Sequence, residues 1–79
     1  MKCAIYKGIK KDDTYLFVEH KDDFSRVSES LLRVLGPLNM VMQLDLTTDT
    51  RLARVNANDV IKQLHDNGFY LQLPPSDYK

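Results

Sequence analysis

The chain has 79 residues, 43% of them hydrophobic, and its eleven basic side chains balance its eleven acidic ones. This length suits one domain with one core, and a net charge of zero provides no long-range attraction to nucleic acid or to an anionic membrane. A single cysteine excludes an internal disulfide and any zinc site that needs two cysteines. The first residues hold too few apolar side chains between charges for a secretory signal or a membrane span, so we expect a cytoplasmic protein.

Two short apolar runs near the N-terminus predict a β-hairpin. Residues 3–6 and 15–18 are rich in aromatic and aliphatic side chains, a composition typical of strands. The polar segment 7–14 between them contains a glycine and a pair of aspartates, which favour a hairpin loop. Both runs are apolar at successive positions, which indicates a sheet that is covered on both faces.

A helix and a third strand follow. Apolar side chains recur at helical spacing up to Leu35, and Gly36 and Pro37 are helix-stop signals. We therefore expect a helix over 28–35. The segment 38–46 then alternates, which predicts a strand. The alternation places five apolar side chains on one face of that strand: Leu38, Met40, Met42, Leu44 and Leu46.

The next segment leads into a second helix. Residues 47–50 are typical of a turn, and 51–55 form either an irregular segment or a single helical turn. Asn56 followed by Asp59 resembles a capping box and predicts a helix that ends at Asn67.

The last strand is predicted between a glycine and a proline pair. Gly68 stands where helices often end with a left-handed residue. Residues 69–73 then alternate, with apolar side chains at 69, 71 and 73 on the face that should meet the core. The prolines at 74–75 cannot donate to a sheet ladder, so the strand should end there and leave 76–79 as a polar tail.

The predicted elements form one α/β (α+β) domain over residues 1–75, in the order β-β-α-β-α-β. The connection from residue 46 to residue 69 is long enough for a right-handed crossover that lays the last strand parallel to the third. We therefore expect an α/β sandwich with a small mixed sheet and short helices packed on it.

The sequence resembles the YcgL-domain family, a set of small gammaproteobacterial proteins. Six segments match in order and spacing: 3–7, 15–18, 22–25, 36–37, 52–53 and 68–75. Ser28 departs from the family pattern, which commonly has proline there. The resemblance implies an α/β sandwich and brings no assigned catalytic residues, because the family is one of unknown function. In some members the gene lies beside that of an RNA-processing exonuclease, which implies a context in RNA metabolism.

Three residues are candidates for catalysis. Cys3 could act as a nucleophile with His20 or His65 as its base. Cys3 has apolar neighbours, however, and both histidines lie in polar segments without a ligand-spaced partner. We therefore expect no catalytic residue, metal or cofactor, and a small enzyme built on Cys3 and one histidine remains the less favoured alternative.

Lysines beside aromatic rings form the first candidate binding site. Lys7, Lys10 and Lys11 lie near Tyr6 and Tyr15 in the predicted hairpin, a combination that suits phosphate attraction and base stacking. Three lysines neutralise only about three phosphates, so we expect RNA binding to be weak or absent. The structural interpretation is a solvated hairpin loop.

Tyr70 and Gln72 form the second candidate, because they occupy the polar face of the last strand. If that face is open, they line a groove. If it is covered, each needs a hydrogen-bond partner.

The sequence thus predicts a non-catalytic binding or protein-interaction module, a monomer or weak dimer with an unidentified protein partner and no membrane contact. The alternative is an accessory factor in RNA metabolism that touches RNA weakly through Lys7, Lys10 and Lys11.

Overall fold

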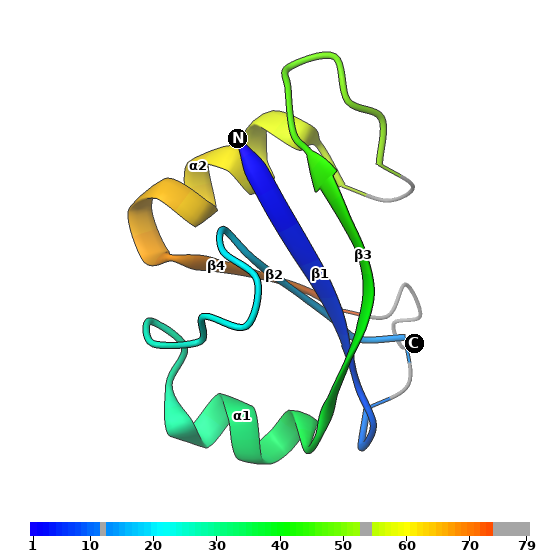
Figure 1. Ribbon diagram of the computed structural model, residues 1–79, viewed down its shortest axis with the longest axis vertical. Coiled ribbons are helices and arrows are strands. Elements are labelled where there is room, and N and C mark those ends of the chain that lie inside the picture. The colour runs from blue at the N-terminus through cyan, green and yellow to red at the C-terminus, as the bar shows by residue number, and fades with distance from the viewer. Residues whose placement is uncertain (12, 53–54, 74–79) are drawn as a thin grey trace.

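The computed structural model describes residues 1–11, 13–52 and 55–73. Within this part of the chain, four strands and two helices occur in the predicted order, which confirms the α+β class (Figure 1). The elements are β1 (Lys2–Gly8), β2 (Tyr15–Val18), α1 (Glu29–Leu35), β3 (Leu38–Asp45), α2 (Ala57–Asn67) and β4 (Phe69–Gln72).

The sheet has the order β3-β1-β2-β4, and every neighbouring pair is antiparallel. The prediction of a mixed sheet, with the last strand parallel to the third, was therefore wrong. The start of β1 lies beside the ends of β2 and β3, and β4 begins at that same end, with Phe69 opposite Val18. The helix α2 lies across this end instead of running back along the strands, so β4 starts where β3 finishes (Figure 1).

The strand β3 contains a β-bulge at Val41. Ile5 of β1 lies opposite Met42 and Tyr6 lies opposite Met40, so Val41 has no partner in the ladder. The bulge moves the side chains after it to the other face. The prediction of one apolar face over 38–46 was therefore wrong.

Each face of the sheet carries its own core and its own helix, as the apolar strands predicted. On the α2 face, the buried core consists of Cys3, Ile5, Phe17, Leu46, Val60 and Leu64. On the α1 face, it consists of Ala4, Tyr6, Leu16, Val18, Val27 and Leu35. The two interior strands are thus enclosed on both sides.

The helix ends follow the capping residues of the sequence. The Ser28 hydroxyl accepts a hydrogen bond from the Leu31 N–H at 3.2 Å, so Ser28 caps α1 one residue before its first turn. The Asn56 side chain accepts from Asn58 N–H at 2.7 Å and caps α2 in the same way. Gly68 ends α2 with φ of 87°, in the left-handed conformation that was predicted.

The last strand lies at an edge of the sheet and is shorter than expected. It ends at Gln72, and Leu73 is 63% exposed instead of facing the core. The proline pair 74–75, the tail 76–79 and Asp12 lie outside the described residues. In the segment 51–55, Arg51 forms an isolated antiparallel bridge with Asn56.

Candidate functional site

The strand register brings three of the predicted binding residues side by side. Lys7 of β1 lies opposite Tyr15 of β2, and Tyr15 lies opposite Gln72 of β4. On the other side of β1, Lys7 lies opposite Asn39 of β3. Directly opposite residues in antiparallel strands share a face. We call this line of four residues across the sheet the polar row.

The polar row lies on the α2 face, beyond the part that α2 covers. Tyr15 packs at the margin of the α2-side core, and α2 lies at the opposite end of the sheet, where β1 begins (Figure 1). Asn39 is exposed, and the other three side chains are half-buried. The row is therefore partly exposed at the surface.

Tyr70 lies two register pairs further in than Gln72, on the same face of the sheet. Its ring meets Phe17 edge-on, with the ring centroids 5.6 Å apart. Tyr70 is half-buried beside the α2-side core, so it supports the sheet surface next to the polar row.

The structure places Lys10 and Lys11 on the opposite face from Lys7. These two lysines line a groove of about 370 Å³, together with residues of α1 and of the end of β4. We call it the basic–apolar groove. It is lined by Lys10, Lys11, Thr14, Leu31, Val34, Leu35, Leu71 and Leu73. The three lysines therefore do not form one cluster.

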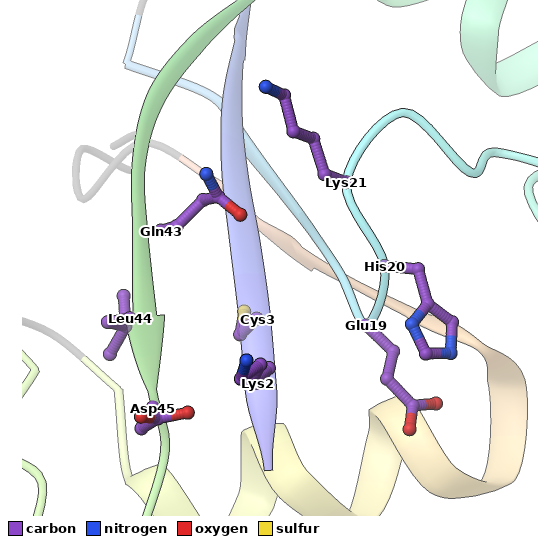
Figure 2. Close-up of a pocket in the computed structure, with 8 residues that line it drawn as sticks. All are labelled: Lys2, Cys3, Glu19, His20, Lys21, Gln43, Leu44 and Asp45. Carbon is purple, nitrogen blue, oxygen red and sulfur yellow. The ribbon is translucent and has the colours of Figure 1, made fainter.

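A second hollow, the polar pocket, lies near the start of β1 and has a volume of about 350 Å³. Figure 2 shows side chains reaching it from β1, from β3 and from the loop after β2. It is lined by Lys2, Cys3, Glu19, His20, Lys21, Gln43, Leu44 and Asp45. Both cationic and anionic side chains line it, so no single ligand charge is favoured.

A buried tyrosine fixes the loop that borders this pocket. The Tyr6 hydroxyl donates to Asp22 Oδ1 at 3.0 Å and accepts from the Asp22 N–H at 2.6 Å. Asp22 has a left-handed backbone with φ of 62°. Burial raises the pKa of Tyr6, which keeps its proton on the hydroxyl. This pair was not predicted from the sequence, although a tyrosine in a buried strand signals the need for a polar partner.

Cys3 lies in the core and is 2% exposed. Burial raises the pKa of its thiol from 9.0 to about 12, so the nucleophilic thiolate is scarce at neutral pH. Cys3 and His20 both border the polar pocket, but Figure 2 shows the His20 ring pointing away from the sulfur.

Neither histidine has a catalytic arrangement in the part of the chain that the structure describes. No hydrogen bond joins Cys3 to His20 or His65 among the described residues, and His65 is exposed beside Asp66 at 3.3 Å. The described residues also contain no group of three or more His, Cys, Asp or Glu side chains that could hold a metal ion. None of the helices described is long and apolar enough to cross a membrane.

These surfaces belong to a small α+β domain in which one antiparallel sheet lies between two helices. The chain belongs to the YcgL-domain family, whose model matches residues 3–75. It is 51% identical over 75 residues to a YcgL domain-containing protein of Proteus mirabilis, a match that covers 95% of this chain and 77% of that protein. A YcgL domain-containing protein of Psychromonas ingrahamii is 48% identical over 75 residues, covering 95% of this chain and 76% of the relative.

One relative is much longer. A Nitrosococcus oceani protein named a putative HAD-like hydrolase is 46% identical over 77 residues, which cover 98% of this chain. The chain spans only 21% of the length of that protein.

Proposed function

We propose that this chain is a non-catalytic module that binds another protein through the polar row. The observation that carries this proposal is the register that aligns Lys7, Tyr15 and Gln72 at the uncovered end of the α2 face. An ammonium, a phenol and an amide together can hold a carboxylate or the backbone groups of a polar segment. These donors sit on paired strands, which hold them in a constant arrangement before binding.

The placement of the thiol supports binding over catalysis. Nucleophilic catalysis by cysteine requires a thiolate close to a base. The burial of Cys3 favours the protonated thiol, and both histidines lie at the exposed surface. The alternative of an enzyme built on Cys3 therefore has less support than a binding role.

The comparison with longer proteins also supports a module. The region similar to this chain makes up most of the Proteus mirabilis relative but about a fifth of the Nitrosococcus oceani one. A domain that occurs both as most of a small protein and as a small part of a long one is consistent with a module that acts by contact with other protein regions.

The distribution of lysines weakens the alternative of RNA contact. Lys7 faces away from Lys10 and Lys11, so at most two of these ammonium groups can meet one nucleic-acid backbone. Each phosphate contact contributes only modestly and fades with salt. We therefore expect a protein partner.

The experiment is affinity capture from lysate with the tagged parent chain and three variants, Lys7→Glu, Gln72→Ala and the control Lys2→Glu. Lys2 is exposed and lies at the other end of β1, so Lys2→Glu makes the same charge change away from the row. The captured protein is then purified and titrated against each variant, with circular dichroism to verify folding. We expect Lys7→Glu and Gln72→Ala to weaken binding roughly tenfold. This change in affinity corresponds to the loss of one to two hydrogen bonds to a charged group.

Two outcomes would contradict the proposal. One is a partner that binds all variants equally well. The other is recovery of RNA instead of protein, with the same dependence on Lys7.

A further inference from the structure

The basic–apolar groove brings together apolar side chains from α1 and from β4 with the residue after it. Val34 of α1 is 51% exposed and Leu73, just after β4, is 63% exposed. Leu31 and Leu71 lie half-buried between them and line the same groove. Isolated exposed apolar residues need no explanation, but convergence from different parts of the chain is typical of a contact surface.

The position of Lys10 at the rim is set by close packing. Its backbone N–H donates to the Leu35 carbonyl at 3.0 Å. Its aliphatic stem lies directly over Gly36, because a Cβ at residue 36 would come within 2.6 Å of Lys10 Cγ. The stem is therefore held against the end of α1, which places the ammonium group beside the apolar lining.

The described lining of the groove carries positive charge. Lys10 and Lys11 both line it, and the described lining includes no aspartate or glutamate. Among the ion pairs of the described residues, none involves Lys10 or Lys11. A ligand with a carboxylate would therefore meet two ammonium groups at the edge of an apolar surface.

We propose that this groove binds an acidic–apolar peptide segment of a partner protein, with leucine-like side chains on the lining and carboxylates at Lys10 and Lys11. The charge of the rim selects the acidic component, and the open apolar lining selects the aliphatic one. Single-stranded nucleic acid fits less well, because its bases stack on aromatic rings and the described lining contains none. This site goes beyond the polar row, since it lies on the opposite face of the sheet.

The test is a titration followed by NMR with three capped ten-residue peptides. The first combines leucines and glutamates, the second replaces each glutamate with glutamine, and the third replaces each leucine with serine. We expect the first alone to shift the methyl signals of Val34 and Leu73, with a dissociation constant below about 1 mM. Its affinity should fall as salt rises, because the contacts lie at the surface.

The matched variants are Lys10→Glu/Lys11→Glu and Lys2→Glu/Lys21→Glu, which change the total charge equally. An exposed ion pair contributes roughly a factor of two to five, and reversal replaces attraction with repulsion at both sites. We expect the first pair to weaken binding of the acidic peptide about tenfold or more, and the second pair to leave it within about twofold. Val34→Ser, an exposed change that should leave the fold intact, tests the apolar lining separately.

Four outcomes would overturn the proposal. They are equal binding of the glutamine peptide, an equal loss in the control pair, tighter binding of a labelled single-stranded RNA, and concentration-dependent shifts of groove signals without peptide. The last would identify a second copy of the chain as the occupant. Because the polar row is untouched by these variants, failure here leaves the proposed function standing.

Discussion

The two interior strands and the two edge strands differ in how much of each is enclosed. In β1 the four residues 3–6 are buried in succession, and in β2 the three residues 16–18 are. Their side chains alternate between the core beneath α1 and the core beneath α2. In β3 and β4, no residue is fully buried. The contrast shows that the interior hairpin supplies stability, whereas the edges supply accessible surface.

Each candidate surface lies where the helical cover stops. The polar row ends on both edge strands, at Asn39 and Gln72. The basic–apolar groove uses Leu71 of β4 and the loop that leaves β1. The interior strands therefore contribute to binding mainly through their ends.

The largest loss of stability is expected at one of two leucines that lie opposite each other. Leu16 of β2 pairs with Leu71 of β4 on the α1 face, but Leu16 is 0% exposed and Leu71 is half-buried. We expect Leu16→Ala to lower the free energy of unfolding by about 2 to 5 kcal/mol, the usual range for a buried leucine. Leu71→Ala should cost about 1 to 2 kcal/mol, because less apolar area is lost.

Urea titration monitored by circular dichroism measures both values. Equal losses in the free energy of unfolding for the two variants would show that the edge strand is as enclosed as the interior strand. This result would contradict the contrast between interior and edge strands.

An intermediate effect, on the pH dependence of stability and on thiol labelling, is expected at Cys3 in an interior strand. The folded pKa of about 12 lies above the reference value of 9.0. The buried thiol therefore supports the fold below pH 9, and that contribution is lost as pH rises from about 9 toward 12. At pH 8 we expect a thiol reagent to label the native protein at least about a hundredfold more slowly than the unfolded chain.

The control is the same reaction in denaturant, and unfolding curves at pH 8 and pH 10 measure the loss of stability. Native labelling at the rate of free cysteine would place Cys3 at the surface and reopen the enzyme alternative.

The smallest effect is expected at the bulge of β3. Val41 is 51% exposed and has no partner in the ladder. Val41→Lys should change the free energy of unfolding by less than about 0.5 kcal/mol, as is usual for exposed positions. Analytical ultracentrifugation of parent and variant provides the second measurement. A parent that dimerises and a variant that does not would show that β3 pairs with a second copy.

Local structure was predicted most reliably from the sequence. The ends of both helices follow from Ser28, Asn56, Gly36 and Gly68, whose side chains or backbone preferences act within a few residues. The apolar composition of β1 and β2 also predicted cover on both faces. The binding candidates Lys7, Tyr15 and Gln72 were identified as residue types, but their alignment in one row was not.

The sequence by itself determined the order of the elements, their caps and the two-sided core, because these depend on contacts between near neighbours and on hydrophobic pattern. Only the tertiary structure decided the strand pairing, the bulge at Val41 and the separation of Lys7 from Lys10 and Lys11. Strand pairing joins residues far apart in the chain, so it depends on how α2 crosses the end of the sheet. A bulge leaves the alternation of residues unchanged while it reverses the face that they occupy, and no pattern within the strand reveals it.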